Sequence, residues 1–136
     1  MASSLSLFLC AHFLYSNVSL LQGENRNLIK FGGASYPSPD AGIVEYVRVE
    51  GLKIQNARME TGITYTSDNG VSGQSYAKNA ACVMIEQGYN IELVGNEITG
   101  CGNGIFVSPG SSGSILVEKN YIHGNGHASS LYEHNV

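Results

Sequence analysis

The sequence of 136 residues has few aspartates, no cluster of basic residues and no helical periodicity, and each shortage excludes a class of protein. Its two aspartates, Asp40 and Asp68, lie far apart, whereas calcium needs several oxygen ligands at one place. The seven lysine and arginine residues are scattered and the net charge is −4, so we expect no nucleic-acid partner. Helical repeats are excluded because no segment keeps a helical pattern for roughly ten residues or more.

Cysteine is also scarce. Cys10, Cys82 and Cys101 form an odd set, and no two of them have the spacing of a metal site. We therefore expect no metal and no other cofactor. The internal repeat places Cys82 and Cys101 at different corners of the fold, which favours free, partly buried thiols over a disulfide.

The most informative feature that is present is an internal repeat. Residues 91–102 return as residues 115–126, at an offset of 24, and the same frame reaches back to residues 47–56 at an offset of 44. The matched pairs are Ile91 and Ile115, Leu93 and Val117, Asn96 and Asn120, Ile98 and Ile122, Gly100 and Gly124, and Gly102 and Gly126. A period of twenty-odd residues indicates a solenoid.

The content of each repeat identifies the kind of solenoid. Each unit contains two or three short runs of alternating apolar residues, separated by glycine, asparagine and serine, which is the pattern of strands and turns. We predict an all-β right-handed parallel β-helix, in which Ile91 and Leu93 point inward and the next coil covers them about 4.8 Å along the axis. Asn96 and Asn120 fall at a bend, where stacked amides can bond one another.

Three stretches carry a resemblance to a known family: residues 46–56, the Asn-x-Ile and Gly-x-Gly frame over 96–126, and residues 131–135. They resemble the secreted right-handed β-helix proteins of the pectate-lyase-like superfamily. The resemblance covers residues 27–136 and implies an extracellular or periplasmic protein with a polysaccharide partner. Because members include lyases, hydrolases, epimerases, adhesins and tailspikes, it specifies the fold and not a reaction.

The repeat also predicts how the chain is divided. Residues 27–136 should form about four to five coils of an incomplete β-helix, with a polar, glycine-rich loop inserted at about 61–79. Residues 1–26 fit either a degenerate signal segment or a start codon inside a longer reading frame. Their apolar run is too short to cross a membrane. Uncapped solenoid ends predict self-association.

The candidate chemistry lies near the end of the sequence. Three of the four histidines fall within twelve positions, and with one glutamate they form a predicted acid/base group: His123, His127, Glu133 and His134. Lys119, Tyr121 and Tyr132 are the predicted substrate-binding residues. The alternative is that all of these are solvated turn residues.

Outward-facing charges suggest a structural role for other residues. Glu92 and Glu97 should form cross-strand charge pairs with Lys119, one coil further on.

Two functions from different classes fit these observations. The first is an extracellular, polysaccharide-associated β-helix protein that forms part of a lyase-like enzyme and is inactive as this segment alone. Hydrolysis is disfavoured because paired aspartates and the Gly-His-Gly pattern of polygalacturonases are missing. The second is a non-catalytic β-helix, either glycan-binding or structural, such as an adhesin or a stalk.

Overall fold

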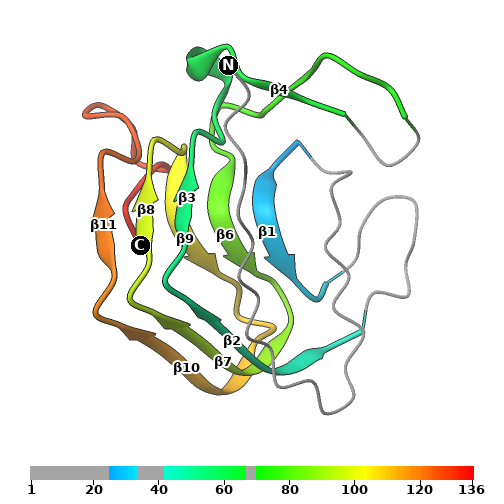
Figure 1. The fold of residues 1–136 in the computed structure, drawn as a ribbon, viewed down its shortest axis with the longest axis vertical. Coiled ribbons are helices and arrows are strands. Elements are labelled where there is room, and N and C mark those ends of the chain that lie inside the picture. Colours follow the sequence, from blue (N-terminus) through cyan, green and yellow to red (C-terminus); the bar gives the residue numbers. More distant parts are fainter. Residues whose placement is uncertain (1–24, 34–41, 67–69) are drawn as a thin grey trace.

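The structure, a computed structural model, describes residues 25–33, 42–66 and 70–136. Its strands form a stack of coils (Figure 1). The strands of the coils are β1 (Asn27–Phe31), β2 (Val44–Glu50), β3 (Lys53–Gln55), β6 (Ala81–Ile85), β7 (Gly88–Val94), β8 (Glu97–Thr99), β9 (Asn103–Val107), β10 (Ser112–Glu118) and β11 (Tyr121–His123). A 3₁₀ turn, η1 (Met59–Thr61), and the short strands β4 (Thr64–Tyr65) and β5 (Gln74–Ser75) lie between the first two coils.

The nine coil strands form three parallel sheets of three strands each, in the orders β1-β6-β9, β2-β7-β10 and β3-β8-β11. The chain passes through one strand of each sheet per coil, so the described residues account for three coils. This arrangement confirms the predicted all-β parallel helix. The predicted number of four to five coils stays a prediction, because residues 1–24 lie outside the described residues.

The observed register is the one that the repeat predicts. Ile98 lies opposite Ile122 on one side and Ile54 on the other, at the predicted offsets. Two further predicted pairs match, Ile91 with Ile115 and Leu93 with Val117, and their partners in the first coil are Val47 and Val49. This register aligns the paired apolar residues of successive coils on the same face of each sheet, since a shift of one residue would turn them to the opposite face.

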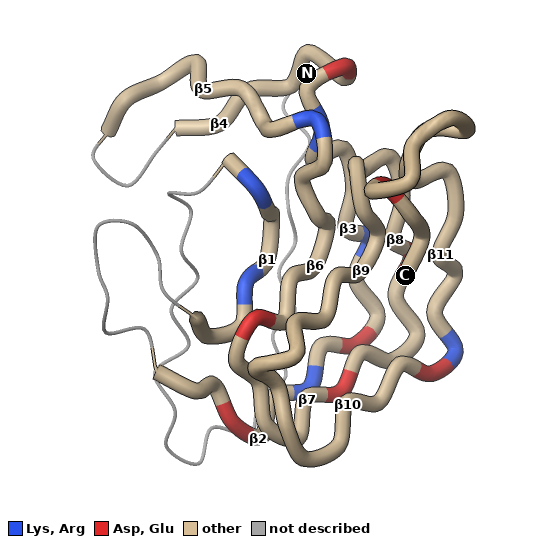
Figure 2. Tube along the Cα trace, turned by 180° about the vertical axis from the view of Figure 1, so that it is seen from behind, with Lys and Arg blue, Asp and Glu red and all other residues tan. Residues whose placement is uncertain are grey.

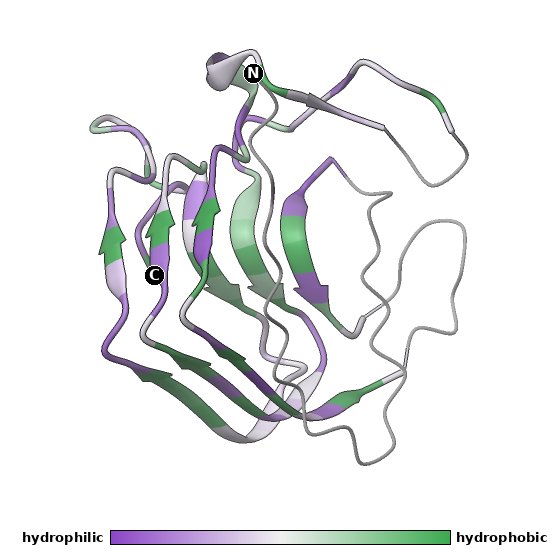
Figure 3. Ribbon diagram, viewed as in Figure 1, coloured by the Kyte–Doolittle hydropathy of each residue, from purple (hydrophilic) through white to green (hydrophobic). Residues whose placement is uncertain are grey.

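The core is the interior of the coil. Apolar and polar residues alternate along the strands, as expected for strands with one buried face (Figure 3). Four large side chains of the middle coil are fully buried: Ile85, Ile91, Leu93 and Ile98. Burying such a side chain stabilises a fold by about 1.5–3 kcal/mol relative to leaving it exposed.

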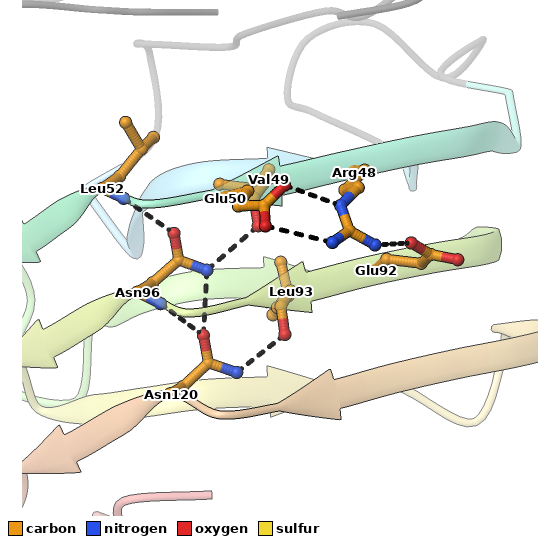
Figure 4. A network of polar contacts seen from close by, with 8 residues as sticks. All are labelled: Arg48, Val49, Glu50, Leu52, Glu92, Leu93, Asn96 and Asn120. Carbon is orange, nitrogen blue, oxygen red and sulfur yellow. Dashed lines mark hydrogen bonds and ion pairs between the residues drawn. The ribbon is translucent and has the colours of Figure 1, made fainter. Parts of the chain in front are cut away.

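Asparagine side chains connect the coils at the bend between the second and third strands (Figure 4). Asn96 Nδ2 and the Asn96 backbone N–H both donate to Asn120 Oδ1, each at 2.9 Å. Asn96 Oδ1 accepts from the Leu52 N–H at 3.0 Å, and Asn96 Nδ2 also donates to the Val49 carbonyl at 3.0 Å. Asn120 Nδ2 donates to the Leu93 carbonyl at 2.7 Å. The predicted amide stack is thus confirmed, and it satisfies backbone groups of the preceding coil.

The same bend requires a left-handed backbone. The three equivalent residues are Gly51, Gly95 and Lys119, with φ of 70°, 63° and 56°. A side chain at the two glycines would meet no atom within 4 Å, so the backbone conformation alone favours glycine there. Lys119 adopts this conformation at the cost that L-residues incur in the left-handed region, about 1–2 kcal/mol.

Cys82 and Cys101 form a disulfide with a Cα–Cα distance of 5.6 Å, so the prediction of free thiols is wrong for these two. Both side chains are fully buried. Both cysteines do lie at different corners: Cys82 lies beside Gly104, and the Cys101 N–H donates to Asn125 Oδ1 at 2.9 Å. The error was to assume that different corners keep the thiols apart, because corner side chains that turn inward meet inside a narrow coil. Cys10 lies outside the described residues.

The segment between the first two coils contains an antiparallel hairpin rather than only a loop. Strands β4 and β5 pair through Thr64 with Ser75 and Tyr65 with Gln74, and the hairpin projects from the coil (Figure 1). The rings of Tyr65 and Tyr76 pack with centroids 4.9 Å apart at its base. This segment leaves and re-enters the solenoid beside the end of β3.

The last residues lie along the edge of β9. The N–H groups of Gly104 and Ile105 donate to the carbonyls of His134 and Asn135, at 2.9 and 3.0 Å. The His134 N–H donates to Asn103 Oδ1 at 2.9 Å. These bonds cover part of the β9 edge and fix the segment that carries Glu133.

Candidate functional site

The titratable side chains of the candidate site meet where the chain leaves β3 and β11. Over the described part of the trace, charged segments are scattered rather than gathered on one face (Figure 2). Five titratable side chains nevertheless come together from three separate stretches of sequence. We call this group the charged corner: Arg58, Glu60, Lys78, His127 and Glu133.

His127 is the centre of the charged corner. Its Nδ1 contacts Glu133 Oε2, and its Nε2 lies 3.5 Å from Glu60 Oε1, which is long for a hydrogen bond. The Glu133 side chain is only 4% exposed, whereas that of His127 is 29% exposed. The buried Glu133 carboxylate therefore orients the His127 imidazole. The second ring nitrogen, Nε2, lies toward Glu60, which is more exposed than Glu133.

Two cations flank this pair. Lys78 Nζ lies 3.9 Å from Glu133 Oε1, and Arg58 Nη1 donates to the Gly126 carbonyl at 3.1 Å, directly before His127. The hydrogen bond with His127 lowers the pKa of Glu133, against the opposing effect of burial, and Ser130 and Lys78 add to the lowering. Glu133 is thus held as a carboxylate, which is the form that orients a donating imidazole nitrogen.

The local sequence explains why the charged corner forms. A turn closed by the bond from the Ser130 N–H to the His127 carbonyl, at 3.0 Å, reverses the chain after β11. The Gly126 N–H donates to the Cys101 carbonyl at 2.9 Å, so the third coil is still in register immediately before His127. The returning chain then places Glu133 beside His127.

The structure separates the predicted acid/base group. His127 and Glu133 lie together. His123 instead stacks on Tyr121, with ring centroids 4.0 Å apart, and its Nε2 lies 3.4 Å from Glu97 Oε1. His134 Nε2 lies 2.8 Å from the Leu131 carbonyl. The four residues of the predicted acid/base group therefore lie at three separate places in the structure.

The predicted substrate-binding residues are also distributed. Tyr121 lies on the outer face of the β3-β8-β11 sheet, and Tyr132 is exposed in the C-terminal turn. Lys119 Nζ lies 3.2 Å from its neighbour Glu118. Among the described residues, none of these three forms a hydrogen bond or ion pair with the charged corner, and their binding role stays a prediction.

Lys119 does not form the expected cross-strand pairs. Glu92 pairs with Arg48 at 2.6 Å, in a network that includes Glu50 (Figure 4), and Glu97 pairs with Lys53 at 2.9 Å. Arg48 and Lys53 both lie in the first coil, one coil before the two glutamates. In the observed register Leu116 lies opposite Glu92 and Tyr121 lies opposite Glu97, whereas Lys119 occupies the bend at the position equivalent to Gly95.

Sequence reasoning missed Arg58, Glu60 and Lys78. A signal for the first two was present, because Arg58 stands at the frame position of Gly102 and Gly126, at the offsets of 44 and 24 that the repeat defines. Extending the frame past Asn56 would have placed residues 58–60 at the same corner of the solenoid as the His127 turn, two coils before it. Nothing in the frame predicts Lys78, since it follows the inserted hairpin.

Neither a metal nor a membrane can be assigned to the described residues. In residues 25–33, 42–66 and 70–136, no group of three or more histidine, cysteine, aspartate or glutamate side chains is arranged to hold a metal ion. The same ranges contain no helix that is long and apolar enough to span a bilayer.

Comparison with known proteins agrees with the architecture. No curated protein and no solved structure matches the chain. The family model described as the right-handed β-helix region matches residues 16–136, which is most of the sequence and includes all three coils. The stacked parallel strands, the inward apolar register and this match together show that the chain belongs to the right-handed β-helix family.

Proposed function

We propose that the chain is part of an extracellular or periplasmic, pectate-lyase-like protein that acts on an acidic polysaccharide at the charged corner. The observation that carries the proposal is His127, held by the almost fully buried Glu133 with Lys78 beside it. The Cys82–Cys101 disulfide supports the location, because disulfides persist mainly in oxidising compartments.

The charged corner contains the groups that β-elimination on a polyuronate requires. A base must remove the proton beside the uronate carboxyl group, and a cation must stabilise the charge that develops there. In the proposed reaction His127 Nε2 takes that proton, a carbon–carbon double bond forms in the sugar, and the bond to the glycosidic oxygen breaks. The leaving oxygen takes a proton from water and becomes a hydroxyl group. Lys78 faces the carboxylate, and Glu133 stabilises the imidazolium that results.

Glu60 has to move away from His127 Nε2 before the proposed reaction can occur. Its carboxylate lies 3.5 Å from His127 Nε2, at the position that the substrate proton would approach. Because both side chains are partly exposed, the contact is weak and a bound sugar can displace it.

The test compares variants of a protein that contains this chain on a polyuronate, with formation of the unsaturated product followed by ultraviolet absorbance. His127→Ala should lower kcat by roughly 10²-fold or more, as expected for the loss of a general base. His134→Ala is the matched control, because its ring contacts only a backbone carbonyl among the described residues. Equal turnover of wild type and His127→Ala, or no turnover on any polyuronate, would refute the catalytic proposal.

A second candidate is a non-catalytic, glycan-binding or structural β-helix. The observation that favours it is that His127 connects Glu60 with Glu133, so the charged corner links the turn after β3 to the C-terminal segment as a structural clamp would. In that case His127→Ala should lower the melting temperature and leave glycan binding unchanged once the protein is folded.

A further inference from the structure

The outer face of the β3-β8-β11 sheet carries two rows of side chains that the charged corner does not use. The strand register aligns Lys53, Glu97 and Tyr121 in one row, and Gln55, Thr99 and His123 in the next. We call these six residues the outer ladder. Neighbouring strands in a sheet are about 4.8 Å apart, so each row spans roughly the length of one to two sugar units.

An aromatic ring stands at the end of the first row. Tyr121 is 65% exposed, and His123 stacks on one face of its ring at a centroid distance of 4.0 Å. The contact between His123 and Glu97 limits the motion of the imidazole, and the imidazole in turn supports the tyrosine ring. A ring held in this way presents apolar surface without first having to be ordered.

The charges of the outer ladder cancel. Lys53 lies 2.9 Å from Glu97, and this contact, followed by that of His123, lowers the pKa of Glu97. The Lys53–Glu97 pair carries one positive and one negative charge, so it has no net attraction for a polyanion. The carboxylate and the Gln55 amide can accept hydrogen bonds from hydroxyl groups, and the ammonium and amide can donate.

We infer that the outer ladder is a binding subsite for neutral sugar units, with Tyr121 as the stacking surface and Glu97 and Gln55 as hydroxyl partners. A pyranose ring combines an apolar C–H face with equatorial hydroxyls, which matches an aromatic ring beside paired polar groups. The inference rests on the proposed polysaccharide partner, but it assigns a separate face of the molecule and a different, uncharged ligand.

The experiment measures retardation of the folded chain in native gels that contain galactan, mannan or xyloglucan, with polygalacturonate as the acidic comparison. At least one neutral polymer should retard the wild type. Tyr121→Ala should weaken that binding by roughly 2- to 10-fold, whereas Tyr121→Phe, which keeps the ring, should bind like wild type. Tyr46→Ala is the matched control, because Tyr46 is also 65% exposed but lies on β2 in another sheet.

The two proposals fail in different ways. Absence of binding to all three neutral polymers, or equal losses in Tyr121→Ala and Tyr46→Ala, would overturn the outer-ladder inference. If His127→Ala retains full turnover while Tyr121→Ala loses neutral-glycan binding, the catalytic proposal fails and the outer ladder stands. Retained neutral binding in His127→Ala would show that the two sites are independent.

Discussion

The second and third coils have nearly the same sequence frame but different surroundings. Ile91 and Leu93 of the second coil have no exposed surface, because strands pair with β7 on both sides. Ile115 is partly buried and Val117 is 38% exposed on β10, which pairs only with β7 among the described strands. In this solenoid a side chain is therefore stabilised by the coil on each side of it, and much less by its own residue type.

The largest expected difference in stability between the two coils comes from a matched pair of substitutions. Ile91→Ala should lower the free energy of unfolding by about 2–5 kcal/mol, since it leaves a cavity between two coils. Ile115→Ala removes the same atoms from a half-covered position and should cost about 1 kcal/mol. Denaturant melts of both variants measure the difference, and equal losses would contradict the role of the neighbouring coil.

The disulfide is a second difference between these coils. The second coil has Cys82 and Cys101 where the third has Gly104 and Asn125. The Cys82→Ala, Cys101→Ala double variant should lose about 3 kcal/mol, because the bond closes a loop of about twenty residues. Thermal melts with and without a reductant provide the check. A reductant that changes the melting temperature of the double variant as much as that of wild type would rule out this explanation.

The stacked asparagines should show the same asymmetry. Asn96→Ala leaves the Leu52 N–H and the Val49 carbonyl without their side-chain partner, and should cost about 2–3 kcal/mol. Asn120→Ala should cost about 1 kcal/mol less, since Asn120 is only partly buried. Urea unfolding of the two variants tests the order, and a larger loss for Asn120→Ala would reverse our interpretation.

Acid should affect the end of the third coil through Glu133. The pKa of this group is lower in the folded protein than its ordinary value of 4.5, so its stabilising effect is fully present above about pH 4.5 and is lost as the pH falls through the folded-state value. Glu133→Gln should therefore reduce the pH dependence of the melting temperature below pH 4.5. Glu45→Gln serves as the exposed control.

The smallest expected effect is a stabilisation. Lys119→Gly gives the third coil the residue that the first two have at this bend, and should raise the free energy of unfolding by about 1 kcal/mol by removing left-handed strain. Gly95→Lys is the reverse change and should destabilise by a similar amount. Unchanged melting temperatures in both variants would show that this bend does not favour glycine over lysine.

The repeat in the sequence was sufficient to predict the strands, their parallel register and the asparagine stack, because a period of twenty-odd residues with alternating apolar positions has few other solutions. The pairing of His127 with Glu133 was partly predictable, since both lie after the last repeat. The structure separates His123 from this pair, because nearness in sequence does not show which turns approach each other, and β11 directs His123 toward Glu97.

The amino-acid pattern is sufficient to specify the repeating coil, with inward Ile91 and Ile98 and outward Glu97. The meeting of separate corners and turns follows only from the folded chain: the Cys82–Cys101 bond inside the second coil, and the approach of Glu60 and Lys78 to the His127–Glu133 pair. The physical reason is that the frame specifies direction along each strand, whereas corner and loop residues lie outside the strand periodicity. Their contacts depend on how separate turns approach in space.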